Sequence, residues 1–184
     1  YTAASLATEQ KKLAANISSS SGLDGSYISL SSLKKNLSES LNLFSKVVLD
    51  PSFPEEDWEK MKKKKMQDLE AQKKDPNNIA SKIFRSLLYG DFYAGRQMSE
   101  ENYENITAAQ MQDWYKNHIA SDQAKIWVGG DITLEEVLPL LEEQFGSWST
   151  KGAELPSKPN MDNVQEVAST QIYFHDIPGA QQSV

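Results

Sequence analysis

The sequence predicts an α+β fold, a mostly antiparallel sheet packed with helices, and three observations support this class. Apolar residues recur at helical spacing in several separate stretches of the chain. Only a few short runs are typical of strands, and one pair of them surrounds an Asp-Gly turn signal. The strands do not alternate strictly with helices, so the pattern does not fit a sheet built from βαβ units.

The N-terminal part predicts a helix followed by a β-hairpin. Residues 2–15 (TAASLATEQKKLAA) form a helix-like stretch. The Ser-rich, β-forming runs 16–22 and 26–33 flank Leu23-Asp24-Gly25, and Asp-Gly is a strong hairpin signal. We therefore expect two antiparallel strands joined by a tight turn.

Three helices are predicted between residues 33 and 89. Apolar residues lie at helical spacing along residues 33–50 and form one continuous stripe, which ends at an Asp-Pro pair. The capping box Ser52-x-x-Glu55 begins a helix that runs to about residue 74. Asp75-Pro76 ends that helix and begins a third, residues 78–89, because Asp is a good N-cap and Pro suits the first helical turn. Apolar residues cover half of the third helix, so we expect it to be sandwiched between other elements.

The following part predicts two more helices and a strand. A polar loop, residues 90–106, precedes a helix that begins at the capping box Thr107-x-x-Gln110. Residues 124–128 have the composition of a buried strand. Another capping box, Thr133-x-x-Glu136, begins a helix that runs to Phe145.

Both ends of the chain lack the features of natural termini. The sequence begins with Tyr1 inside a helix-like stretch, without an initiator Met or a signal peptide. It closes just after a strand-like run at residues 169–175, which residues 149–165, with the Gly, Pro and Lys content of a linker, separate from the preceding helix. We therefore expect the chain to be a segment of a longer protein.

Charge and composition exclude several classes of function. The chain contains 19 Lys and Arg against 26 Asp and Glu, a net charge of −7, so it lacks the basic surface of a nucleic-acid binder. It has no cysteine, which excludes disulfides, thiolate metal sites and thiol nucleophiles. Its two histidines, His118 and His175, stand 57 positions apart and form no local metal motif. No apolar run approaches the roughly 20 residues of a membrane span. We expect no nucleic-acid partner and no membrane span.

The most conspicuous charged feature is a lysine cluster in the second of the three helices predicted between residues 33 and 89. Its members are Lys60, Lys62, Lys63, Lys64, Lys65, Lys73 and Lys74. A solvated helix face is the ordinary interpretation of such a cluster. By helical angle, however, Lys62 and Lys65 lie within the apolar stripe of that helix, so they must snorkel or face a polar space. The wall of a substrate chamber is the functional alternative.

Four motifs occur in one unbroken order over residues 1–148: LDPSFPEEDW, DPNNIASKIFRSLLYGDFYAG, WYKNHIASDQAKIWVGGDIT and FGSW. In this combination and spacing, the chain resembles the pitrilysin/insulinase-type zinc metallopeptidases, which include the mitochondrial processing peptidases. Each motif alone is weak. Their order and spacing make the resemblance specific.

The resemblance implies a zinc endopeptidase built from repeated α+β halves, of LuxS/processing-peptidase-like architecture, that enclose a substrate chamber. In that family an inverted His-x-x-Glu-His motif supplies two zinc ligands and the general base. This motif is absent from the present sequence. A third ligand, a Glu, is expected on the long helix before Asp75-Pro76, where this chain has Lys62–Lys65 and Gln67, with Glu70 a few residues beyond.

The resemblance therefore favours a non-catalytic copy, which closes the chamber of a zinc-bearing copy. The C-terminal residues Asp176-x-Pro178-Gly179 and Gln182-Ser183 favour it too, because they resemble the start of the next unit in the copy that lacks zinc. Two alternatives remain. One is the back portion of a catalytic half whose metal motif lies upstream of Tyr1, and the other is a purely structural scaffold domain.

The expected organisation is a partial peptidase-like domain over residues 1–148, a linker over 149–165 and the first strand of a following α+β unit over 166–184. The expected partners are a zinc-bearing catalytic copy, in the same chain or in a partner subunit, and a peptide substrate. We expect no catalytic residue, metal ligand or cofactor in this segment, which should be inactive alone. Lys62 and Lys65 are the candidate substrate-binding residues and would favour acidic peptides. The compartment is left open, periplasmic or cytoplasmic if the protein is bacterial.

Overall fold

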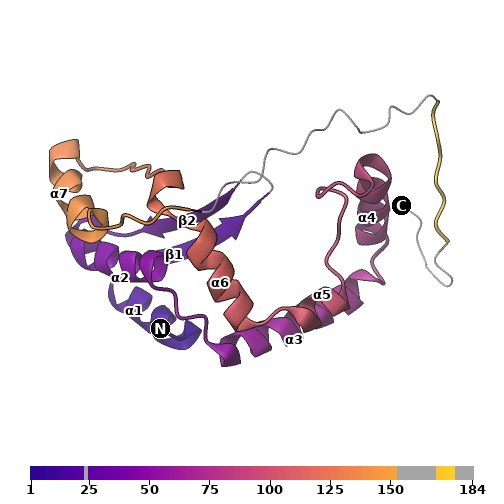
Figure 1. Cartoon of the computed structure of the whole chain (residues 1–184), viewed down its shortest axis with the longest axis horizontal. Helices are drawn as coiled ribbons and strands as arrows, with labels where there is room; N and C mark the ends of the chain where they lie inside the picture. The colour runs from indigo at the N-terminus through magenta and orange to yellow at the C-terminus, as the bar shows by residue number, and fades with distance from the viewer. Residues whose placement is uncertain (23–24, 153–168, 177–184) are drawn as a thin grey trace. The chain divides into compact units, whose positions relative to one another are not determined.

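The computed structural model describes residues 1–22, 25–152 and 169–176, and the chain divides into two compact units (Figure 1). Unit 1 comprises Tyr1–Trp58 and Thr107–Leu155, and unit 2 comprises Glu59–Ile106 and Pro156–Val184. The described elements combine helices with a two-stranded antiparallel sheet, which confirms the predicted α+β class. No described helix is long and apolar enough to cross a membrane.

The sheet of unit 1 is the predicted hairpin, formed by β1 (Asn16–Ser21) and β2 (Ser26–Ser31). Ile17 lies opposite Leu30 in the antiparallel register, and alternation places Ile28 on the same face. These three side chains are half-buried, and the following helix contacts β2. The other face carries mainly serines and is exposed. Two of the predicted turn residues lie outside the described part of the chain.

Helix α1 (Ala3–Lys12) ends in a Schellman motif whose left-handed position is occupied by Ala14. Ala14 N donates to Lys11 O at 3.2 Å and Ala15 N donates to Gln10 O at 2.9 Å, which are the two hydrogen bonds of this motif. Ala14 has a φ of 46°, a left-handed conformation that costs a residue with a Cβ about 1–2 kcal/mol. Glycine adopts it without this steric cost.

The substitution Ala14→Gly is therefore expected to raise the free energy of unfolding by about 1 kcal/mol. Chemical denaturation of this variant beside Ala15→Gly measures the effect. Ala15 has no left-handed backbone, so its substitution should not stabilise the chain. Equal changes in the denaturation midpoint at the two positions would contradict the assigned strain.

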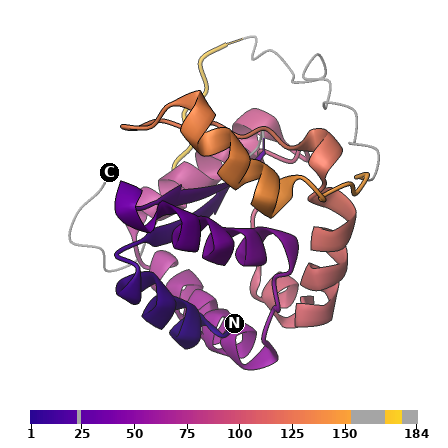
Figure 2. The same ribbon diagram turned by 90° about the vertical axis from the view of Figure 1, so that its left-hand side faces the viewer.

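The core of unit 1 lies along α2 (Leu37–Leu49) and α7 (Leu134–Phe145), which contact each other and run side by side (Figures 1 and 2). A short 3₁₀ turn, Lys34–Asn36, precedes α2, so the helix predicted over residues 33–50 is confirmed. The Phe44 and Phe145 rings meet edge to face at 6.1 Å. The buried apolar residues of the two helices are Leu41, Leu43, Val48 and Val137.

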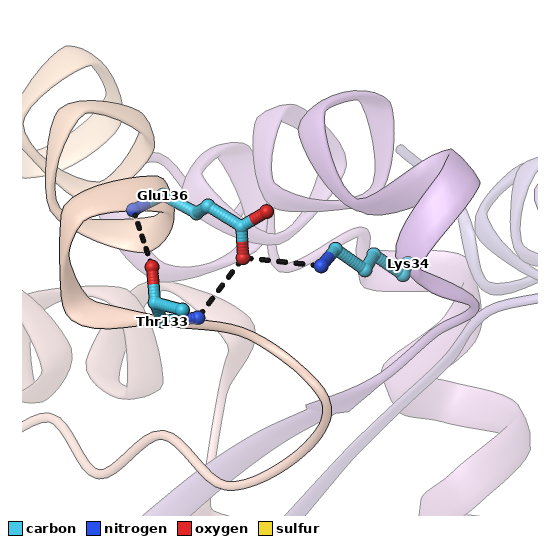
Figure 3. A network of polar contacts seen from close by, with 3 residues as sticks. All are labelled: Lys34, Thr133 and Glu136. Carbon is cyan, nitrogen blue, oxygen red and sulfur yellow. Dashed lines mark hydrogen bonds and ion pairs between the residues drawn. The ribbon is translucent and has the colours of Figure 1, made fainter.

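A polar network fixes the start of α7 (Figure 3). Glu136 N donates to Thr133 Oγ1 at 3.3 Å and Thr133 N donates to Glu136 Oε2 at 3.0 Å, which is the predicted capping box. The same carboxylate oxygen accepts from Lys34 Nζ at 3.0 Å. The backbone hydrogen bond from Thr133, and then Lys34, hold the pKa of Glu136 below its usual value. This network ties the start of α7 to the turn before α2.

Helix α6 (Ala108–His118) also belongs to unit 1 and begins at the predicted capping box of Thr107 and Gln110. Tyr115 Oη donates to Val48 O at 3.0 Å, and its ring lies 5.5 Å from that of Phe53. Burial raises the pKa of the Tyr115 phenol above its usual value. The aromatic pair and the hydrogen bond attach α6 to the end of α2.

The described helices of unit 2 are α3 (Glu55–Gln72, from Glu59 onward), α4 (Pro76–Tyr89) and α5 (Glu100–Asn105). Asp75 caps α4 as predicted, since its Oδ1 accepts from Asn77 N at 3.0 Å. Helix α5 lies inside residues 90–106, which were expected to be a loop, so that expectation is wrong there. The physical cause is a capping box between Ser99 and Asn102, which begins the short helix.

Three other expectations differ from the structure. Residues 124–128 and 169–175 are expected as strands, but neither pairs with a strand in the described part of the chain. Trp127 is 75% exposed and Ile172 is 92% exposed, so these segments are not buried either. Helix α4 is expected to be sandwiched, yet it has no buried residue, and Phe84 is 63% exposed. A strand requires a hydrogen-bonded neighbouring strand, and an apolar helix face is buried only where another element packs on it. The local sequence pattern does not determine either of these.

Candidate functional site

One face of α3 forms a groove in unit 2, which we call the α3 groove. Its volume is about 530 Å³. Its α3 residues recur at three- and four-residue spacing, which places them on one side of a helix. The lining residues are Glu59, Lys62, Lys63, Met66, Gln67 and Glu70 of α3 and Glu100 of α5. The groove therefore lies in the lysine cluster that the sequence singles out.

The two candidate lysines occupy different positions. The Lys62 side chain lines the groove, is only 17% exposed and pairs with Glu59 Oε1 at 2.5 Å. Lys65 is exposed and does not line the groove. Two residues of an α-helix span about 200°, so Lys65 lies on the opposite side of α3 from Lys63. Lys62 and Lys65 are three residues apart, so they lie about 60° from each other around the helix, and only Lys62 lines the groove.

A lysine clamp joins the end of α3 to α5. Lys73 Nζ lies 2.5 Å from Glu70 Oε1 and 2.5 Å from Glu100 Oε1. The hydrogen bond from Lys73 is the main cause that holds the pKa of Glu70 below its usual value. The carboxylate of Glu100, followed by that of Glu70, raises the pKa of Lys73 above its usual range. Both shifts favour the charged forms of Glu70 and Lys73, and the clamp joins α5 to this end of the groove.

The groove also contains two polar groups with unused hydrogen-bonding capacity. None of the hydrogen bonds or ion pairs among the described residues involves Lys63 or Gln67. Lys63 is a donor only, whereas the Gln67 amide both donates and accepts. By contrast, the carboxylates of Glu59, Glu70 and Glu100 each form an ion pair with a lysine.

The described residues in and around the α3 groove do not offer the ligands of a zinc ion. Gln67 lies in the stretch where the family resemblance expects a carboxylate ligand, and lysines hold the nearby Glu59 and Glu70. His118 stacks on Trp114 with ring centroids 4.7 Å apart, and its Nδ1 lies 2.8 Å from Trp114 O. Within the described ranges, no three His, Cys, Asp or Glu residues gather in a way that could hold a metal.

Sequence reasoning missed three residues of the groove, Glu59, Met66 and Glu100. Met66 belongs to the predicted apolar side of α3, but nothing in the sequence shows that it lies in a hollow. Glu100 reaches the groove because α5 forms, and the signal for α5 was the Ser99-x-x-Asn102 capping box.

Two family descriptions match adjoining parts of the chain. Residues 1–105 match the insulinase family, peptidase family M16. Residues 105–183 match the peptidase M16 inactive domain. An uncharacterized zinc protease of Mycobacterium leprae is 23% identical over 122 residues, which cover 65% of this chain and 27% of that protein.

Solved structures share the fold. The peptidase M16 inactive domain of Pseudomonas fluorescens matches with a TM-score of 0.74 and 23% identity, over 83% of this chain and 38% of that one. A protease of Helicobacter pylori gives a TM-score of 0.68 and 16% identity over 84% and 38%. The periplasmic protease PqqL of Escherichia coli gives 0.67 and 18% over 78% and 17%. The chain thus spans well under half the length of each of these proteins.

Proposed function

Because the chain belongs to the insulinase family, peptidase family M16, we propose that it is part of the non-catalytic copy of a zinc metalloendopeptidase. In this proposal the copy closes the substrate chamber opposite the zinc and helps to hold the peptide. The match of residues 105–183 to the M16 inactive domain is the observation that carries it. The absence of a His-x-x-Glu-His motif and the amide at Gln67 agree with it.

The partner in this proposal is a zinc-bearing copy of the same family, in the same polypeptide or in another subunit. The general base and the metal would both come from that copy, so this segment alone would hydrolyse no peptide. A solved structure described as the first half of PqqL supports an arrangement in halves for that protein. This chain covers 32% of that half.

A second candidate is the back portion of a catalytic half. The match of residues 1–105 to the insulinase family itself, whose description does not mention inactivity, favours it. The sequence of the full-length protein separates the two candidates. A His-x-x-Glu-His motif shortly upstream of Tyr1 indicates the catalytic half, whereas a motif several hundred residues away or on another chain indicates the inactive copy.

Lys62 and Lys65 are proposed to lie along the chamber wall and to favour acidic peptides. Replacing both by Gln in the full enzyme is expected to raise KM for acidic peptides by about two- to fivefold, since a charge pair near water contributes about 1 kcal/mol. Lys62 is already paired with Glu59, so Lys65→Gln should carry most of the change. Steady-state kinetics with matched acidic and neutral peptides at low and high salt measures it. An equal response of both peptides, or of neither, would contradict the proposal.

A further inference from the structure

The floor of the α3 groove has an apolar character despite its charged rim. Met66 is the one apolar residue among the described residues that line it. Long polar side chains cover apolar surface with their aliphatic stems and keep their polar ends in water. Lys62 follows this behaviour, since its side chain is only 17% exposed. The hollow can therefore accept an apolar group.

The rim is neutral as a whole, with Glu59, Glu70 and Glu100 against Lys62, Lys63 and Lys73, but its ion pairs leave the charge of Lys63 outside them. Lys62 pairs with Glu59, and Lys73 pairs with both Glu70 and Glu100. Lys63 has no such partner among the described residues. An occupant that brings a carboxylate beside Lys63 would pair with it, whereas a cation placed beside Lys63 would be repelled.

The Gln67 amide specifies a further property of the occupant. It offers a donor and an acceptor on the same wall as Lys63, and both are unused among the described residues. An extended backbone presents an N–H and a C=O to such an amide, whereas the backbone groups inside a helix are already bonded to each other. A volume of about 530 Å³ suits a short segment and not a folded domain.

We propose that the α3 groove binds an extended peptide segment that places one apolar side chain on Met66 and a neighbouring carboxylate beside Lys63. The inference rests on the proposed peptide-holding function and names the chemistry of the peptide. It differs from a preference for acidic peptides in general, because the apolar side chain is required and Lys62 is already neutralised. Lys65, which does not line the groove, takes no part in it.

The test uses three unstructured, fluorescein-labelled peptides that differ only at two central positions: Leu-Asp, Leu-Asn and Ser-Asp. The chain is labelled with ¹³C at its five methionine methyl groups. The Leu-Asp peptide should shift the Met66 methyl resonance and leave that of Met61 unchanged. Its affinity, measured by anisotropy, should exceed that of the Ser-Asp peptide about tenfold. It should exceed that of the Leu-Asn peptide about two- to fivefold, with this second difference vanishing at high salt.

Matched variants assign the effects to the groove. Lys63→Gln should abolish the difference between the Leu-Asp and Leu-Asn peptides. Lys64→Gln removes the same charge from an adjacent exposed position outside the groove and should leave every affinity unchanged. Met66→Ser should weaken both Leu peptides about tenfold, whereas Met66→Leu, which keeps an apolar side chain, should bind as the original chain does.

Several results would overturn the inference. If the peptides shift Met61 or Met98 and not Met66, they bind elsewhere, and the peptide-holding function survives without the groove. If the bound peptide becomes helical, the groove is a helix-docking surface instead. If no peptide binds at millimolar concentration, the groove and the peptide-holding function both fail, while the assignment as an inactive copy is still judged by metal content.

Discussion

Leu43→Ala is expected to lower the free energy of unfolding of unit 1 by about 2–5 kcal/mol. Leu43 is 4% exposed on α2, the helix that contacts both α7 and β2. Shortening it removes apolar contacts and leaves a cavity that the neighbouring elements fill only in part. The chain should then unfold at a clearly lower denaturant concentration with an unchanged slope, because the folded architecture is retained.

Leu138→Ala is the matched control for this prediction. Leu138 lies on α7 of the same unit and undergoes the same change of side chain, but it is 47% exposed. Its substitution should cost well under 1 kcal/mol, since exposed positions contribute little to stability. Equal losses at the two positions would contradict the assignment of the core to the α2 side facing α7.

The helices could be predicted from sequence because their signals are local. Thr107 and Thr133 each stand three residues before a Gln or Glu, and Asp75 precedes a proline. A cap is satisfied by the backbone of the same turn, so its formation depends little on distant parts of the chain. The short helix α5 carried the same kind of signal at Ser99, but its polar composition resembles that of a loop.

The strands outside the hairpin could not be predicted in this way. Residues 124–128 and 169–175 have β-forming composition, but a strand is stabilised by neighbours that are distant in sequence. The prediction of the hairpin was correct because β2, the partner of β1, follows immediately after the turn. Composition therefore identified β-forming segments correctly only where pairing was local.

The candidate site was predictable in part for a similar reason. Lys62 was found because helical angle places it on the apolar side of α3, and the structure puts it in the groove. Lys65, three residues further on, was assigned to the same side, but it does not line the groove. Glu100 and its link to Lys73 depend on how α5 packs on α3, which no local pattern determines.

The central claim is that this chain is the inactive copy, and its zinc content tests that claim most directly. A catalytic zinc site needs three protein ligands, usually His with a carboxylate. Here the family's histidine motif is absent, Gln67 and lysines occupy the stretch where a ligand Glu is expected, and ammonium groups beside a site disfavour a divalent cation. The two histidines cannot supply a local pair, since they are 57 positions apart.

The measurement is metal analysis of the purified, tag-free chain after it has been loaded with zinc and dialysed. Addition of an unstructured peptide to the same preparation tests for hydrolysis that a chelator abolishes. The account predicts zinc far below one ion per chain and no chelator-sensitive hydrolysis. One zinc per chain that survives dialysis would contradict it and would assign the segment to a catalytic half.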